Sequence, residues 1–599
     1  MSKALLAAEP DQSVPVVETI IPVPGRTLRE LYSIEVQFAE PVIGVDAGDL
    51  LVNGVAATNM IQIAPSDFLF TFPQPGDGLV RIEWSANHGI TDQAEPAHPF
   101  SGGSWTYALD STLPSPSLFI SEFMADNKDT INDEDGDSSD WIEIGNSDSE
   151  PASLAGWYLT DNPANPTKWA FPEVDVPARG FIVVFASGKN RADIAGKLHT
   201  NFKLASTGGY LALVDPRTNV VSDFAPVYPK QFTDVSYGRV PGEITTIGYF
   251  TRPTPGTQNT SGGPGFAPAV EFSRPSCTFT TPFELELRTS LPDAVIRYTL
   301  DGNLPTNSSP VYAGPLWITN SVQVRARAYQ QGLLPGPPSS ESYIILHTNV
   351  VAFSSDLPVI VLHTLGKGTP NASRLTFAHM SVFEPAGGQT SLTNSPTLTS
   401  RVGIQIRGSS TEGIAKSSYK LEVWDEFNAD RKLGILGMPP ESDWVLYAPN
   451  NFEPVLIHNP FVHQLSRDMG RYSPRTRFVE VYLNKSTGPI TPTHYVGIYV
   501  LEEKIKIGPD RLDIGKLEPE ITTPPAVTGG YLMKIDRLDP GDTGLSAGGA
   551  NIAMVDPKEK EIKSPQRIAQ KNYLVSYLNA FRTALYSTNW RDPVLGYKP

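Results

Sequence analysis

Short segments of alternating apolar and polar residues, separated by proline and glycine, run up to about residue 350 and restrict that part of the chain to β-rich modules. Ile34, Val36 and Phe38 alternate with polar or small residues, which is the pattern of a half-buried strand. Similar segments occupy residues 50–55, 68–72 and 79–84. The spacing predicts an Ig-like sandwich over residues 16–110. Residues 1–15 are predicted to be disordered or the remnant of a leader.

The length, net charge and cysteine count of the chain limit the class of protein. A chain of 599 residues is too long for one core, and about three to five domains are expected. Its net charge of -17 argues against nucleic acid as a partner, although a metal–nucleotide brings its own cation. The single cysteine, Cys277, excludes an intrachain disulfide and a cysteine-type zinc site. No apolar run of about eighteen residues occurs, so no membrane span is expected.

Six motifs follow one another within residues 114–259. They are FISEFMADN (Phe119–Asn127), DEDGDSSDWIEIGN (Asp133–Asn146), LAGWYLTD (Leu154–Asp161), FKLASTGGYLALVD (Phe202–Asp215), VSYGR (Val235–Arg239) and RPTPGTQN (Arg252–Asn259). Together they resemble a bacterial lamin-tail domain, which implies a second Ig-like sandwich. The module over residues 16–110 is similar to the bacterial Ig-like modules of large surface proteins.

An acidic knot lies inside the second module. The carboxylates of Asp133, Asp135, Asp137 and Asp140 are candidate ligands for Ca²⁺, because hard cations prefer clustered carboxylate oxygens. The segment fails the EF-hand register, since placing Gly136 sixth puts isoleucines at the first and twelfth positions. A solvated acidic turn is the competing interpretation.

The third module begins after the Gly/Pro-rich segment SGGPGFAP. A strand, a DGN turn and a second strand can be recognised in AVIRYTLDGNLPTNSSPVYAGPLWITNSVQVRARAY (Ala294–Tyr329). The segment resembles the small β-domain at the C-terminus of chitobiase-type hexosaminidases, and we assign it residues 265–346. In that family the domain is an accessory module. No pair of carboxylates supports a glycosidase here.

Helical signals first occur in the last 250 residues or so. Asn459-Pro460 opens one predicted helix, with an apolar face of Phe461, Val462, Leu465 and Met469. Ser564-Pro565 opens a second, with an apolar stripe of Ile568, Leu574, Leu578, Phe581 and Leu585. Strands lie between the two helices, so this region is predicted to be an α+β domain.

The stretch IQIRGSSTEGIAKSSYKLEV (Ile404–Val423) carries the strongest chemical signal. It reads as a strand, a Gly/Ser/Thr turn and a second strand. Gly408 and Gly413 have P-loop spacing, but the Lys-Ser pair comes two residues late and a strand follows where a P-loop needs a helix. A hairpin that covers phosphates, with a strand lysine reaching them, is compatible with the pattern. An ordinary polar hairpin is the alternative.

Several motifs in one order resemble the CotH-type family of secreted and spore-coat atypical protein kinases. They are LPVIVLHT (Leu357–Thr364), RVGIQIRGSS (Arg401–Ser410), KSSYKLEVWD (Lys416–Asp425), LGMPPESDWVLYAP (Leu436–Pro449), FVEVYLN (Phe478–Asn484), HYVGIYVLEEKI (His494–Ile505) and GGYLMKID (Gly529–Asp536). The resemblance implies a kinase domain over residues 350–599 that uses ATP and Mg²⁺. The expected fold is multidomain, with three consecutive all-β Ig-like sandwiches followed by this α+β kinase-like domain.

The resemblance also suggests site residues. Arg407, Gly408 and Ser410 match the family's Arg-Gly-x-Ser turn, and Lys416 matches its lysine. We assign Arg407 and Lys416 to the nucleotide phosphates and Glu503 to holding Lys416, because a carboxylate stabilises a desolvated lysine. Glu502 is an equally placed rival, and a solvated strand end is the other interpretation of Glu503.

Two departures from the family are visible. His458-Asn459 stands where the family has Arg-Asn, which puts a phosphate role for this position in doubt. The downstream segments that carry the family's catalytic and metal-binding aspartates are absent, and Asp592 matches neither. We therefore expect the kinase domain to be incomplete at its C-terminus, with no useful phosphoryl transfer by this chain.

Two functional hypotheses follow. The first is an exported bacterial surface protein that carries the beginning of a CotH-type kinase acting on a protein substrate. The second is a non-catalytic protein that binds extracellular glycan or matrix through its sandwiches. Both place the chain outside the cell or at its surface.

Overall fold

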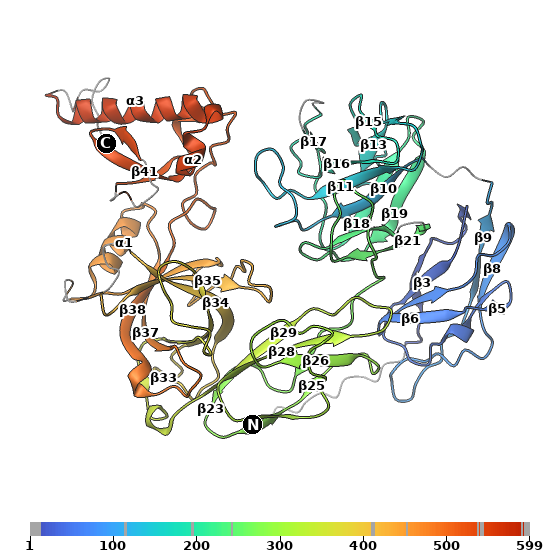
Figure 1. Ribbon diagram of the computed structural model, residues 1–599, viewed down its shortest axis with the longest axis horizontal. Helices are drawn as coiled ribbons and strands as arrows, with labels where there is room; N and C mark the ends of the chain where they lie inside the picture. The colour runs from blue at the N-terminus through green and yellow to red at the C-terminus, as the bar shows by residue number, and fades with distance from the viewer. Residues whose placement is uncertain are drawn as a thin grey trace.

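The computed structural model describes residues 13–112, 117–192, 197–240, 243–408, 414–450, 453, 455–535, 538, 544–588 and 591. The chain is mostly β and forms successive modules along its length. Figure 1 shows the first two modules at the right, the third at the bottom and a barrel at the left, with the C-terminal part above the barrel. None of the helices in the described ranges is long and apolar enough to cross a membrane.

The first module consists of two sheets around one core. One sheet has the order β1 (Val17–Ile21), β3 (Ser33–Phe38), β7 (Asp67–Thr71), β6 (Asn59–Ala64). The other has the order β2 (Thr27–Leu28), β9 (Ser104–Leu109), β8 (Gly78–Trp84), β4 (Leu50–Val52), β5 (Val55–Ala56). Ile34, Val36 and Phe38 are buried between the sheets, which confirms the alternation that predicted the strand.

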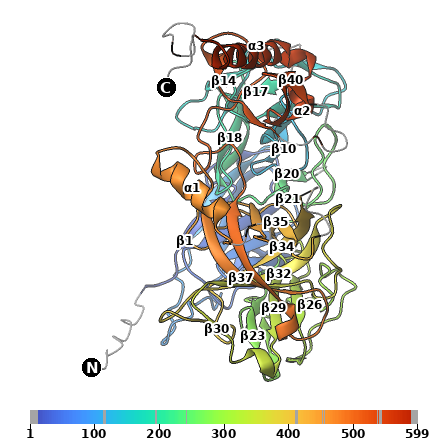
Figure 2. The same ribbon diagram turned by 90° about the vertical axis from the view of Figure 1, so that its left-hand side faces the viewer.

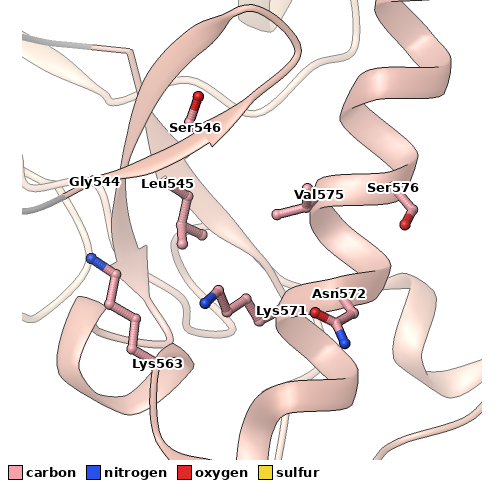
Figure 3. Close-up of a pocket in the computed structure, with 8 residues that line it drawn as sticks. All are labelled: Gly544, Leu545, Ser546, Lys563, Lys571, Asn572, Val575 and Ser576. Atoms are coloured by element: carbon pink, nitrogen blue, oxygen red, sulfur yellow. The ribbon is translucent and has the colours of Figure 1, made fainter.

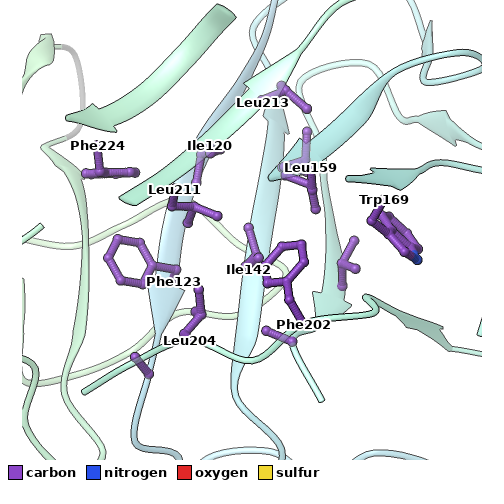
Figure 4. Close-up of a cluster of buried hydrophobic side chains, with 14 of the residues drawn as sticks. Ile120, Phe123, Ile142, Leu159, Trp169, Phe202, Leu204, Leu211, Leu213 and Phe224 are labelled. Carbon is purple, nitrogen blue, oxygen red and sulfur yellow. The ribbon is translucent and has the colours of Figure 1, made fainter. Parts of the chain in front are cut away.

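The second module is a larger sandwich. Its six-stranded sheet has the order β17 (Leu198–His199), β16 (Phe181–Phe185), β11 (Trp141–Asn146), β10 (Leu118–Met124), β20 (Ser236–Val240), β21 (Glu243–Phe250). The four-stranded sheet has the order β14 (Trp169–Ala170), β13 (Tyr158–Thr160), β18 (Gly209–Val214), β19 (Val220–Tyr228), and β12 (Ala152–Ser153) pairs with β15 (Asp175–Val176). Phe123, Ile142 and Leu213 belong to the core where the sheets meet (Figure 4).

The third module shares a core with the barrel. Its main sheet has the order β23 (Cys277–Phe279), β29 (Ser339–Ile345), β28 (Val322–Tyr329), β26 (Val295–Thr299). Two short pairs complete it, β22 (Glu271–Phe272) with β25 (Leu287–Arg288) and β24 (Phe283–Leu285) with β27 (Leu316–Ile318). Ile344 at the end of β29 packs in one cluster with Val361 and Tyr482 of the barrel. Arg325 Nη2 also lies 3.2 Å from Glu426 Oε2 across the same boundary. The third module and the barrel are therefore packed together.

Seven strands close into a barrel that carries the candidate site. The order is β31 (Val359–His363), β32 (Thr376–Phe383), β34 (Leu398–Arg407), β35 (Ser418–Trp424), β36 (Asp443–Tyr447), β38 (Tyr495–Glu503), β37 (Thr476–Asn484). A small pair, β30 (Ser354–Ser355) with β33 (Thr390–Ser391), lies beside it. β34 and β35 pair in antiparallel register from Arg401 with Trp424 to Arg407 with Ser418, which confirms the two predicted strands; residues 409–413 of the turn lie outside the described residues.

Helices are few in the C-terminal region, and their predicted core faces are largely wrong. The first is α1 (His458–Asp468), in which Phe461 is 60% exposed, and Met469 just beyond it is 70% exposed. The last is α3 (Ile568–Leu585), in which Leu574 is buried but Ile568 and Leu585 stay exposed. A sheet of order β39 (Leu532–Lys534), β41 (Ala550–Asp556), β40 (Leu545–Ala547) and the short α2 (Glu559–Ile562) accompany α3. Figure 2 shows α3, α2 and β40 at the top, above the barrel strands, and α1 beside the barrel.

Candidate nucleotide-phosphate site

A cavity of about 250 Å³ lies on the outside of the barrel, where β34, β35, β36 and β38 meet α1. Its charged lining residues are Arg407, Lys416 and Glu502, and Asn459 of α1 closes one side. The cavity therefore brings together the arginine and the lysine that the sequence predicted, next to the rival carboxylate.

Lys416 is held by the backbone. Its Nζ donates to the carbonyl oxygens of Pro449 at 2.9 Å and Ile498 at 2.6 Å, and it lies 5.0 Å from the ring centroid of Tyr499. Burial lowers the pKa of Lys416 below its usual range. Among the described residues, no carboxylate lies within ion-pairing distance of this ammonium. The lysine is thus fixed in place while its charge stays unneutralised by an acidic side chain.

Glu503 does not hold Lys416. It is buried and accepts hydrogen bonds from Arg475 N at 2.9 Å and from Arg475 Nε at 3.2 Å, and it pairs with Arg511 Nη1 at 2.8 Å. Successive side chains of a strand point to opposite faces, so Glu503 and Glu502 face different neighbours. The structure gives Glu503 a structural role at the end of β38, and neither arginine partner was foreseen from the sequence.

Glu502 faces the cavity. Its side chain is only 13% exposed, and its Oε2 is buried without a hydrogen-bond partner among the residues that the structure describes. Burial raises its pKa to about 7, and the charge of Arg407 opposes that rise. His463 Nε2 on α1 lies 3.9 Å from the same oxygen, too far for a hydrogen bond. Alternation along β38 could have separated Glu502 from Glu503, but it could not tell which face carried the cavity.

The turn of the hairpin is described only at its two ends. Arg407 is exposed at the end of β34, and Gly408 has a φ of 94°, a backbone conformation that favours glycine. Ser410 lies outside the described residues, so its predicted phosphate contact stays a prediction.

The residues around the cavity fit the phosphates of a nucleotide together with a divalent cation. Arg407 and Lys416 supply positive charge for phosphate oxygens. The partnerless Oε2 of Glu502 is the kind of hard oxygen ligand that Mg²⁺ binds alongside substrate phosphates.

The acidic knot of the second module contains its own cation. Carboxylate oxygens of Asp133, Asp135 and Asp137 lie within 4.8 Å of one another, and Lys189 Nζ lies 2.7, 2.6 and 3.1 Å from them in that order. Burial tends to raise the pKa of Asp133 and of Asp135, but hydrogen bonds from Lys189 hold both pKa values below the usual range. Asp140 is not part of the group; its Oδ1 accepts from Asn127 N at 3.3 Å. The ammonium thus occupies the centre of the predicted Ca²⁺ site.

A wider hollow of about 610 Å³ lies between α3 and β40 (Figure 3). It is lined by Lys563 and Lys571 among others, and Lys563 Nζ donates to Glu559 Oε1 at 2.6 Å. It contains none of the residues that the sequence singled out.

Comparison with known proteins supports the modular description. Three family models match: the Lamin Tail Domain over residues 111–227, the Chitobiase/beta-hexosaminidase C-terminal domain over residues 274–340, and the CotH kinase protein over residues 404–595. The barrel strands β31 and β32 precede the CotH match, and β20 and β21 follow the lamin-tail match, so the folded units extend beyond the matched segments. No curated protein sequence matches the chain.

Solved structures show distant likeness only. CopC from Methylosinus trichosporium OB3b is 12% identical, covers 16% of this chain and 93% of its own, and has a TM-score of 0.13. The ICAM-5 D1-D4 ectodomain fragment is 7% identical, covers 68% of this chain and 98% of its own, and has a TM-score of 0.11. These scores are too low to support an inference. On the family matches, the chain is a multidomain protein with a lamin tail domain, a chitobiase/hexosaminidase C-terminal domain and a CotH kinase domain.

Proposed function

We propose that the CotH domain binds the phosphates of ATP between Arg407 and Lys416, as the phosphate-binding part of a kinase whose substrate is a protein. One observation supports this most: Lys416 is fixed by two backbone carbonyls at a cavity, and none of the acidic side chains that the structure describes pairs with it. A half-buried, prepositioned cation of this kind is suited to an incoming anion, since its electrostatic interactions are screened less than at the open surface.

The chemistry of phosphoryl transfer favours such a site. The reaction depends on positioning and on stabilising the charge of the phosphates rather than on covalent steps by the protein. Arg407 would present its planar fork to phosphate oxygens, and Lys416 would act as a point charge beneath them. When bound, Mg²⁺ would neutralise part of the phosphate charge. The cavity of about 250 Å³ suits the phosphate end better than a whole nucleotide.

Calorimetric titration of the full chain with Mg²⁺–ATP tests this proposal. Lys416→Met should weaken binding by about 10- to 100-fold, the range expected for losing a hydrogen-bonded charge. Lys485→Met, at an exposed position after β37, is the matched control and should bind as the parent does. Equal affinity of the Lys416→Met variant and the parent protein would rule out this site.

We further propose a location at the cell surface. The β modules that precede the barrel favour this, because such arrays suit extended surface proteins. Binding of glycan or matrix by these modules is the second candidate activity. Labelling of intact cells by an impermeant amine reagent would test it, with a cytoplasmic protein as the control. Labelling only after lysis would contradict the surface location.

A further inference from the structure

We propose that Glu502 holds the divalent cation that the phosphates of the nucleotide bring into the cavity. This inference rests on the proposed function. It gives a role to Glu502, which from the sequence was only an equally placed rival of Glu503 for holding Lys416.

The first argument is that Glu502 has an unsatisfied hydrogen-bond acceptor. Its Oε2 is buried and finds no hydrogen-bond partner in the described ranges, although an unsatisfied buried acceptor typically costs about 1–3 kcal/mol. The charged and titratable groups that face it come from four elements: Arg407 at the end of β34, Lys416 before β35, Tyr447 of β36 and His463 on α1. None of them forms a hydrogen bond or an ion pair shorter than 3.9 Å with the carboxylate. Glu502 lines the cavity, so a cation that enters the cavity lies beside a carboxylate that is not fully hydrogen-bonded.

The second argument concerns charge. In the free protein the positive charge of Arg407 partly compensates the Glu502 carboxylate. Phosphates bound to Arg407 and Lys416 would neutralise the positive charge that offsets the Glu502 carboxylate. They would also add negative charge beside it. A proton on Glu502 would relieve the repulsion only in part. A divalent cation shared by the carboxylate and the phosphates removes it, and Mg²⁺ is usually bound by one or two carboxylates plus substrate phosphates and water.

The third argument is that the neighbouring acid is not free to do this. Glu503 already pairs with Arg475 and Arg511 and is fully buried. Glu453, also near α1, accepts from Tyr447 Oη and from His458 N, each at 2.5 Å. Of the acids described around this end of the barrel, Glu502 is the one that combines exposure to the cavity with an unbonded oxygen.

The experiment compares ATP affinity with Mg²⁺ and with EDTA, by calorimetry on the full chain. The parent protein should bind Mg²⁺–ATP at least about tenfold more tightly than metal-free ATP. In Glu502→Gln this enhancement should vanish, while metal-free ATP binds equally or more tightly because the repelling charge is gone. Glu502→Asp should retain part of the enhancement. Glu520→Gln, an exposed acid elsewhere in the same region, is the control and should behave as the parent does.

The outcomes separate the two proposals. If the parent protein binds no ATP under either condition, the proposed function fails. If it binds ATP and Glu502→Gln keeps the full Mg²⁺ enhancement, the phosphate site stands and the role of Glu502 is refuted. An equal loss with and without metal would show a packing defect and would also refute that role.

Discussion

The acidic knot of the lamin-tail module and the cavity of the CotH barrel are both clusters of charge, but among the described residues only the carboxylates of the knot are paired with cations. In the knot, Lys189 contacts three aspartates and Arg191 Nη1 lies 2.7 Å from one of them, Asp135. In the described part of the cavity, Lys416 contacts two carbonyls and the ring of Tyr499 but no carboxylate, and Glu502 Oε2 has no hydrogen bond. A cluster whose charges are paired is suited to stability, whereas unpaired, partly buried charges are suited to a ligand.

The same contrast separates two adjacent residues. Glu503 resembles the acids of the knot, because two arginines satisfy it, and Glu502 belongs with the cavity. The family motif points to the first of these acids, and the position of the cavity points to the second. Three measurements can test this comparison between paired and unpaired charges.

The largest effect is expected at Glu503. Glu503→Gln would leave Arg511, whose side chain is 3% exposed, without its carboxylate and should lower the free energy of unfolding by about 4 kcal/mol. Thermal unfolding followed by calorimetry measures the change in the transition that contains the barrel. Glu502→Gln should leave that transition unchanged or raise it at neutral pH. If Glu502→Gln proved the more damaging of the two, the division between the acids would be wrong.

The next effect is expected in the knot. Lys189→Met removes the central cation from three carboxylates, and the side chain of Asp133 is completely buried, so a loss of about 3 kcal/mol is expected. The vacated centre should then accept Ca²⁺, and added Ca²⁺ should raise the melting temperature of this variant but not of the parent. Lys128→Met, at an exposed position of the same module, is the control. A Ca²⁺ response in the parent protein would show that Lys189 does not close the site.

The smallest effect is a pH dependence. Burial raises the pKa of Glu502 from its ordinary 4.5 to about 7, so the folded protein retains a proton that the unfolded chain has already lost. The contribution of Glu502 to stability is therefore present at low pH and declines as pH rises, by about 2 kcal/mol between pH 5 and 7. Unfolding of the parent and of Glu502→Gln across that range measures it. Parallel profiles for the two proteins would contradict the assignment.

Several features of the fold could be predicted from the sequence because they are local. Alternation located β3 and the β34–β35 hairpin, and turn residues separated the modules. The helices α1 and α3 were also found, since periodicity is a local signal, but their predicted caps were wrong. Ile457 caps α1 in place of Asn459, and Arg567 caps α3 in place of Ser564. Their buried faces were not found. An apolar stripe shows which face of a helix is able to pack, but Phe461 of α1 stays exposed in the described structure.

The candidate site was predictable only in part. Arg407 and Lys416 flank one hairpin, so their sequence separation already brought them together, and the structure places both at the cavity. Lys189 lies 52 to 56 residues from its three aspartate partners, and no local pattern connects them. The acidic knot was therefore interpreted without its cation, and Asp140 was included in a group to which it does not belong.

By itself the sequence determined the β-rich modules, their order and the strand–turn–strand that carries an arginine and a lysine, because strand period and turn chemistry act between near neighbours. Tertiary structure alone decided which charges are satisfied. Closure of the barrel brings β36, β38 and α1 around Lys416, turns Glu502 toward the cavity and gives Glu503 its arginines. The physical reason is that the energy of a buried charge depends on partners distant in the chain, which only the completed fold brings within a few ångströms.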